Sequence, residues 1–155
     1  MCRPIDPSFA PEERLFIRVS YARVRDGHVR PDAIRIEDCA VSVNREKYSD
    51  SPADVLLAAA PEHNGIAFIV AGDVPTAFRP PADHLVSRVV DDPICNSAPL
   101  PDNKAHAEIR FVERGKPYDK QMPLRAAVKS RLKDAIADRL NIYLYPTKYG
   151  PVNES

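Results

Sequence analysis

The chain has 155 residues, the length of one ordinary domain, which can bury a core without disulfides or structural metals. Its 22 basic and 22 acidic side chains cancel, and hydrophobic residues make up 44% of it. This composition argues against a protein that coats nucleic acid, an acidic solvating tail and a disordered chain. Sixteen prolines against five glycines predict short elements joined by stiff connections.

The cysteines and the first residues of the chain bear on its compartment. Cys2, Cys39 and Cys95 are widely spaced without a CxxC pair, which argues against a disulfide framework or a zinc knuckle. Residues 1–7 lack the apolar segment of a signal peptide, and no apolar run is long enough to cross a bilayer. We therefore expect a cytoplasmic protein with reduced thiols and no membrane partner.

The first half of the chain predicts an arm, several strands and a short helix. Residues 1–13 are rich in proline and predict an irregular arm, and residues 15–24 and 33–45 predict strands, the second bent or divided. Asp26-Gly27 is a turn signal between them. Ser51-Pro52-Ala53-Asp54 predicts a short helix, because serine caps, proline suits the first position and an acid follows. Residues 66–71 predict a buried strand.

The second half predicts two more strands and a longer helix. Residues 85–90 predict a strand, 91–103 a loop, and 105–114 a strand with strict alternation of apolar and polar residues. Residues 123–140 carry an apolar stripe at helical spacing, and 141–146 predict a short extended segment. We expect an α+β fold with a mostly antiparallel sheet of five or six strands, one short helix and one long C-terminal helix. The predicted domain spans 14–146, between the arm at 1–13 and a loose tail at 147–155.

Charge is unevenly distributed along the chain. Residues 49–108 carry three basic and nine acidic side chains, whereas residues 109–155 carry ten basic and five acidic ones. A molecule with an acidic middle and a basic C-terminal helix can steer a charged partner although its total charge is zero. The helix residues that we expect to contact a protein partner or nucleic acid are Arg125, Lys129, Lys133 and Arg139.

The main polar cluster surrounds the loop at 91–103, in a chain without phosphate-loop, zinc-protease or nucleophile-elbow motifs. His106 and Glu108 share a face of their predicted strand, with Cα atoms about 6.6 Å apart. That spacing fits a histidine–carboxylate pair in which the histidine is a general base. With Asp92 or Asp102 nearby it also fits a divalent metal, although we expect neither a metal nor another cofactor. In a structural alternative, Asp102 and Asn103 form a turn that His106 ties down.

A second group of candidates lies earlier in the chain. Arg18 falls on the first predicted strand, and Ser42-Val43-Asn44-Arg45 falls on the second. A buried arginine on a central strand needs an anionic partner, because its guanidinium cannot be neutralised. That partner is either a ligand phosphate or carboxylate, or an Asp of the acidic middle segment. The candidate catalytic residues are His106, Glu108 and Ser42, and the candidate ligand-binding residues are Arg18, Asp92 and Asn103.

Two runs carry a resemblance to small bacterial proteins with a D-P-x-x-D-N-x-A-H-A pattern. These runs are Val89-Val90-Asp91-Asp92-Pro93 and Pro101-Asp102-Asn103-Lys104-Ala105-His106-Ala107-Glu108-Ile109. In the resembling proteins a strand with an arginine and an S-V-[DN]-R run precede the pattern, and Arg18 and Ser42-Val43-Asn44-Arg45 match them, so the resemblance covers about residues 15–110. Residues 94–100 are an insertion and the helix at 123–140 an extension. The resemblance implies a bacterial, cytoplasmic protein of accessory character and marks Asp92, Asn103 and His106 without naming a reaction.

Three functions follow from these observations. The first is an accessory protein that binds a protein partner through its bipolar charged surface. The second is a small transferase or hydrolase with a pocket for an anionic ligand, formed by Arg18, Ser42, Asn103 and His106. The third is nucleic-acid binding through the basic helix at 125–139.

Overall fold

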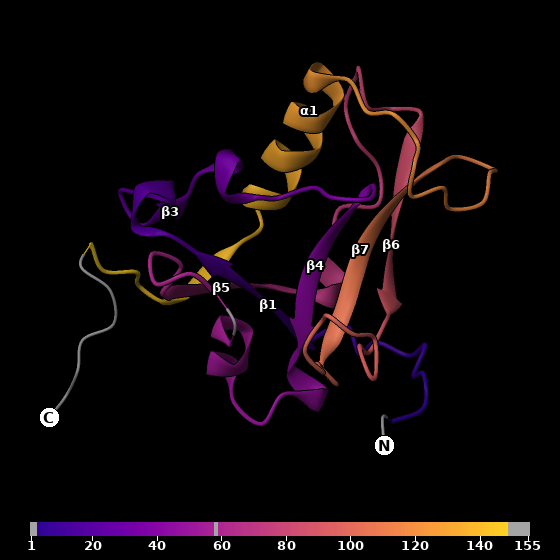
Figure 1. Ribbon diagram of the computed structural model, residues 1–155. Helices are drawn as coiled ribbons and strands as arrows, with labels where there is room; N and C mark the ends of the chain where they lie inside the picture. The colour runs from indigo at the N-terminus through magenta and orange to yellow at the C-terminus, as the bar shows by residue number, and fades with distance from the viewer. Residues whose placement is uncertain (1–2, 58, 149–155) are drawn as a thin grey trace, which may run out of the picture.

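The structure is a computed structural model that describes residues 3–57 and 59–148. Six strands form one antiparallel sheet in the spatial order β6-β7-β4-β1-β5-β8, and two more form a small ribbon (Figure 1). The fold is therefore α+β, as predicted. The sheet strands are β1 (Arg14–Val19), β4 (Ala40–Arg45), β5 (Gly65–Val70), β6 (Leu85–Asp91), β7 (His106–Glu113) and β8 (Asn141–Leu144), and the ribbon consists of β2 (Val24–Arg25) and β3 (His28–Val29).

Among the described residues there is one α-helix, α1 (Ala126–Ala137), and it is shorter than the predicted helix at 123–140. Arg125 is extended, with ψ 153°, because Leu124 packs against the core from a non-helical segment before the helix begins. β8 (Asn141–Leu144) follows α1, in agreement with the extended segment predicted at 141–146, so the helix is not the last element. Five short 3₁₀ helices complete the fold: η1 (Tyr21–Arg23), η2 (Pro31–Ala33), η3 (Glu46–Tyr48), η4 (Pro52–Leu56) and η5 (Ala71–Asp73).

Local signals predicted some boundaries well and others poorly. Ser51 and Asp54 form the capping box of η4. Asp26 and Gly27, both with positive φ, form the turn between β2 and β3. The predicted strand at 33–45 is reduced to β4, because a tight turn through Asp38 and Cys39, also with positive φ, precedes it.

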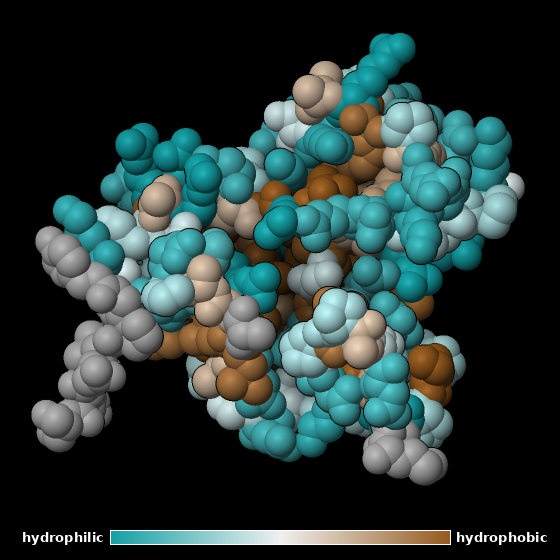
Figure 2. Space-filling view, in the orientation of Figure 1, coloured by the Kyte–Doolittle hydropathy of each residue, from teal (hydrophilic) through white to brown (hydrophobic). Residues whose placement is uncertain are grey.

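The core lies on one face of the sheet. Alternate residues of β1, β4, β5 and β7 point to this face, where Val128, Leu132 and Ile136 of α1 meet them. β1 and β4 pair only through Leu15 with Arg45 and Phe16 with Asn44, and beyond these pairs the two strands diverge (Figure 1). The surface around the core is mostly hydrophilic, with hydrophobic residues visible in a recess in the middle of the face in Figure 2.

Residues 3–13 contain no helix or strand, but they seal the end of the sheet at which β4 stops. Arg45 is fully buried there and donates to the carboxylate oxygens of Glu13 at 2.8 and 3.0 Å. It also donates to the main-chain oxygens of Asp6 and Ser8 at 2.9 and 2.7 Å, and its Nη1 lies 3.2 Å from Oδ1 of Asp91. Asp91, in the acidic middle segment, is thus one partner of a buried arginine, as expected from the sequence, but the arginine is Arg45 rather than Arg18, and its nearest carboxylate is Glu13.

Asp91 is the centre of this buried network. Arg3 donates to both of its carboxylate oxygens, at 2.6 and 2.7 Å, and the backbone N–H of Asp6 donates at 2.7 Å. The Arg3 guanidinium stacks 3.5 Å from the ring centroid of Tyr48. These contacts fix the end of β6, where Asp91 leads into Asp92.

Two expectations about compartment have different outcomes. Cys39 is a free, buried thiol, but Cys95 is disulfide-bonded, so the expectation of reduced thiols is wrong for Cys95. In the described part of the chain, the structure holds no helix with the length and apolar character needed to span a membrane. The tail expected at 147–155 lies, beyond residue 148, outside the described residues.

Candidate functional site

A polar site lies on the sheet face opposite the core. Ser42 and Asn44 of β4 point to this face, and across the ladder they pair with Glu108 and His106 of β7. The neighbouring pair carries a backbone hydrogen bond, from the N–H of Arg45 to the oxygen of residue 105. Asn44 and His106 therefore form a non-hydrogen-bonded pair, in which Cα atoms are about 4.5 Å apart and side chains are closest.

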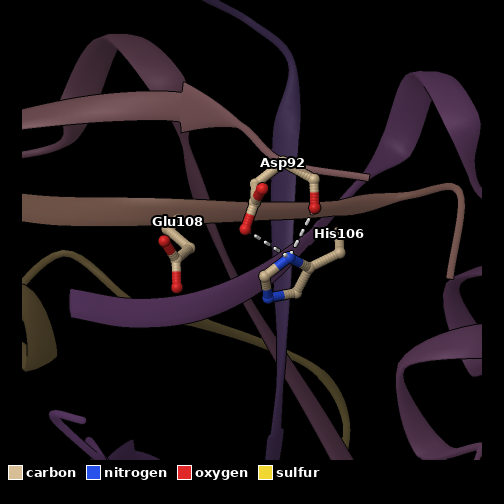
Figure 3. Close-up of side chains that lie close together, drawn as sticks. All are labelled: Asp92, His106 and Glu108. Carbon is tan, nitrogen blue, oxygen red and sulfur yellow. Dashed lines mark hydrogen bonds and ion pairs between the residues drawn. The ribbon is translucent and has the colours of Figure 1, made fainter. Parts of the chain in front are cut away.

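His106 is held at both ring nitrogens. Its side chain is 11% exposed, Nδ1 lies 2.7 Å from the main-chain oxygen of Asp92, and Nε2 lies 3.2 Å from Oγ of Ser42. Figure 3 shows the ring turned toward Asp92, whose carboxylate Oδ2 is 3.5 Å from Nδ1. A carbonyl oxygen can only accept, so Nδ1 carries the proton in the neutral ring. Nε2 is then the acceptor for the Ser42 hydroxyl, the arrangement of a base facing its hydroxyl.

Asn103 ties the preceding loop to β4 and thereby fixes the orientation of Asn44. The N–H of Ala105 donates to Oδ1 of Asn103 at 3.1 Å, so Nδ2 of Asn103 donates to Oδ1 of Asn44 at 2.8 Å. The amide Nδ2 of Asn44 is left buried without a hydrogen-bond acceptor among the described residues. Such an unpaired donor costs about 1–3 kcal/mol. Because the atom is shielded from solvent, it is not available to a ligand in this conformation.

Asp92, His106 and Glu108 have ligand atoms within 4.8 Å of one another, which is metal-site spacing. The positively charged guanidinium of Arg110, however, already lies beside two of these residues. Arg110 donates through Nε to Glu108 at 2.9 Å, and its Nη2 lies 4.0 Å from Oδ2 of Asp92. Nδ1 of His106 is also committed to the Asp92 carbonyl. The residues present are therefore better matched to acid–base chemistry than to metal binding.

Of the residues selected from the sequence, the structure brings together Ser42, Asp92, Asn103, His106 and Glu108, and it leaves Arg18 apart. Arg18 is exposed on β1 opposite Ile66 and forms no hydrogen bond or ion pair with any described residue. Since β1 and β4 diverge, its Cα lies more than about 11 Å from that of His106 by strand geometry.

Two arginines that we did not select from the sequence lie on this face. Arg110 follows Glu108 at the next outward position of β7, and Arg88 of β6 is its direct partner across the ladder. The alternation of residues in the segments 85–90 and 105–114 was sufficient to predict which face of its strand each arginine lies on. It was not sufficient to show that β6 pairs with β7.

The basic residues of the helix do not form one outward face. Ser130, Asp134 and Asp138 are exposed on its outer side, whereas Lys129 and Lys133 are half-buried on its flank, and Arg125 and Arg139 lie just beyond its ends. None of these four cations forms an ion pair with a described residue, and Arg131 donates to the main-chain oxygen of Pro80 at 3.2 Å. Two acids on the outer side weaken the case for nucleic-acid binding at this helix.

Two pockets of about 310 and 330 Å³ are both lined by Pro123 and Leu124, which precede α1, and by residues of its first turns. Neither is lined by Arg18, Ser42, Asn103 or His106. Because Arg18 lies apart on β1, these four residues do not form the shared pocket that we expected, and Ser42 is exposed on the face of the sheet. Comparison with protein-family models, with curated proteins and with solved structures found no match to this chain. The geometry of the site itself is therefore the basis for assigning a function.

Proposed function

We propose that this protein is a small hydrolase or transferase in which Ser42 is the nucleophile and His106 the general base. One observation carries the proposal: Oγ of Ser42 lies 3.2 Å from Nε2 of a histidine whose Nδ1 is bound to the Asp92 carbonyl at 2.7 Å. A nucleophile, a base within hydrogen-bond reach and a third group that orients the base are the elements of an activated serine.

The chemistry needs no further group of the chain for its first step. As Oγ of Ser42 attacks an acyl or phosphoryl centre, its proton passes to Nε2 of His106, and the imidazolium then gives a proton to the leaving oxygen. The Asp92 carbonyl holds the Nδ1 proton throughout, and the Asp92 carboxylate, 3.5 Å away, stabilises the positive ring. Because Ser42 is exposed on an open face, the substrate supplies the cover that a pocket would otherwise provide.

A fluorophosphonate probe tests this proposal without knowledge of the substrate. We expect covalent labelling of Ser42, found by peptide mapping, with no label on that peptide in Ser42→Ala. His106→Ala should slow labelling about 100-fold or more, since base catalysis contributes that much. Ser130 is an internal control, because it is exposed on α1 and its side chain forms no hydrogen bond with a described residue. Equal labelling of Ser42 and Ser130 would show that Ser42 is not activated.

Partner binding through the charged surface is a second candidate, favoured by the four cations at Arg125, Lys129, Lys133 and Arg139 that lack an acidic partner among the described residues. A bound acidic protein would compensate them. We expect native mass spectrometry of protein purified from its own host to show a partner at fixed stoichiometry. Its loss in a Lys129→Glu, Lys133→Glu variant, but not in Arg18→Glu, would support this candidate, and a bare monomer would count against it.

A further inference from the structure

Two arginines face each other beside the reactive pair. Arg88 of β6 and Arg110 of β7 are direct cross-strand partners on the open face. In the next row of the ladder, Glu108 pairs with Ser42 of β4, so Arg110 is the diagonal neighbour of Ser42. Diagonal neighbours have Cα atoms about 7–8 Å apart, within reach of a long side chain.

Among the described residues, a single hydrogen bond to a carboxylate, from Arg110 to Glu108, offsets only part of the positive charge of this pair. Arg110 donates to Glu108 through Nε, and its guanidinium lies 4.6 Å from the ring centroid of Tyr118. Its terminal nitrogen Nη2 lies 4.0 Å from the carboxylate of Asp92. Arg88 is exposed and forms no hydrogen bond, ion pair or ring contact with a described residue.

Like charges directly opposite each other destabilise an antiparallel pair. An anion between the two guanidinium groups removes that repulsion and receives donors from both. A single guanidinium can bind both oxygens of a carboxylate. A tetrahedral phosphoryl group has more acceptor oxygens and can therefore accept hydrogen bonds from two guanidinium groups at once. Glu108 does not oppose such an anion strongly, because Arg110 already binds it at 2.9 Å.

We propose that Arg88 and Arg110 bind a phosphoryl group of the substrate, next to Ser42 on the open face of the sheet. This names the substrate class for the proposed function and rests on it for the reaction, while the anion site itself can be tested separately. The anionic ligand expected from the sequence is thus assigned to these two arginines and not to Arg18.

Titration with inorganic phosphate, followed by NMR of the arginine Nε–H signals at constant ionic strength, tests the anion site. We expect saturable shifts of the Arg88 and Arg110 signals with phosphate and none with acetate. Arg88→Gln should weaken phosphate binding about tenfold, the loss of one charge-assisted contact. Arg18→Gln is the matched control, since Arg18 is equally exposed and unpaired among the described residues but lies on β1.

Protection of Ser42 tests where the anion binds. Phosphate at a concentration near its Kd for the unmodified protein should slow fluorophosphonate labelling of Ser42 in that protein and in Arg18→Gln, but far less in Arg88→Gln. Phosphate binding without any labelling of Ser42 would leave the anion site standing and overturn the proposed function. Shifts absent at both arginines, equal shifts with acetate, or equal weakening by Arg18→Gln would overturn the anion site. Glycerol phosphate and an oligonucleotide without terminal phosphate then distinguish a small monoester from a nucleic-acid backbone.

Discussion

Asp91 and Asp92 are neighbours at the end of β6, yet their surroundings are opposite in kind. Strand alternation sends Asp91 to the face sealed by residues 3–13, where its side chain is fully buried against Arg3 and Arg45. Asp92 points to the other face, where its side chain is 44% exposed and its main-chain oxygen holds His106. Asp91 holds two segments of the fold together, whereas Asp92 orients the largely buried His106 ring toward the exposed Ser42.

The comparison separates two uses of polar residues in one sheet. A buried ion network stabilises only if every member is paired, because removal of one partner leaves a desolvated charge. On the open face, Ser42 is exposed and the Asp92 side chain is 44% exposed, so their loss should cost little stability, whereas the largely buried His106 ring is held by two hydrogen bonds. Four substitutions test this difference, in order of decreasing expected effect on stability.

Arg45→Met should have the largest effect. It leaves Asp91 and Glu13 buried without their shared cation, which we expect to lower the free energy of unfolding by about 3–5 kcal/mol. Urea denaturation followed by circular dichroism measures the loss. Arg18→Met, at an exposed arginine of the same sheet, is the control and should change it by less than about 0.5 kcal/mol. Equal effects of the two variants would show that burial does not distinguish the two regions.

Asp91→Asn should cost about 3 kcal/mol at neutral pH and progressively less in acid. Burial by itself raises the pKa of Asp91, but the donors of Arg3, Asp6 and Arg45 outweigh it and hold the pKa below the ordinary 3.8. Because the folded pKa is the lower one, the stabilisation is complete above the unfolded pKa and is lost as the pH falls through the folded value. Urea midpoints at several pH values should therefore converge for the two proteins below about pH 4. A constant difference down to the most acid point would contradict this assignment.

His106→Ala should cost about 1–2 kcal/mol, since its ring hydrogen bonds join the Asp92 end of β6 to β4. For a chain of this size, that is a fall in melting temperature of about 2–4 °C per kcal/mol. His84→Ala provides the reference, because His84 is exposed and its side chain forms no hydrogen bond with a described residue. An unchanged melt for His106→Ala would remove the structural role of the ring and leave only the functional one.

Ser42→Ala should have the smallest effect, within about 0.5 kcal/mol, because Ser42 is exposed and its one recorded side-chain hydrogen bond is to His106. The same variant should abolish fluorophosphonate labelling at this position. Ser42→Ala would then remove the reactivity of this position while leaving the stability of the protein nearly unchanged. A large loss of stability would instead place Ser42 in the structural part of the molecule.

The sequence alone determined the local features. Alternation placed His106 and Glu108 on one face of a strand, and the Ser51–Asp54 pattern predicted the start of η4, because both depend on a few consecutive residues. It also identified most of the site, since Ser42, Asp92 and Asn103 stood out as polar residues at the ends or on the faces of predicted strands. The helix at 123–140 was overestimated, because helical spacing cannot show that Leu124 reaches the core from an extended segment.

Only the tertiary structure determined which arginines are buried in ion pairs and which lie on the open face. Arg18 and Arg45 both lie on central strands, and only the docking of residues 3–13 and the end of β6 buries Arg45 among Glu13 and Asp91. Likewise, only the pairing of β6 with β7 sets Arg88 opposite Arg110 and holds the Asp92 carbonyl against His106. These contacts join segments up to 88 residues apart, so no local pattern contains them. Residue type and alternation determined the candidates, and long-range strand pairing determined which of them meet.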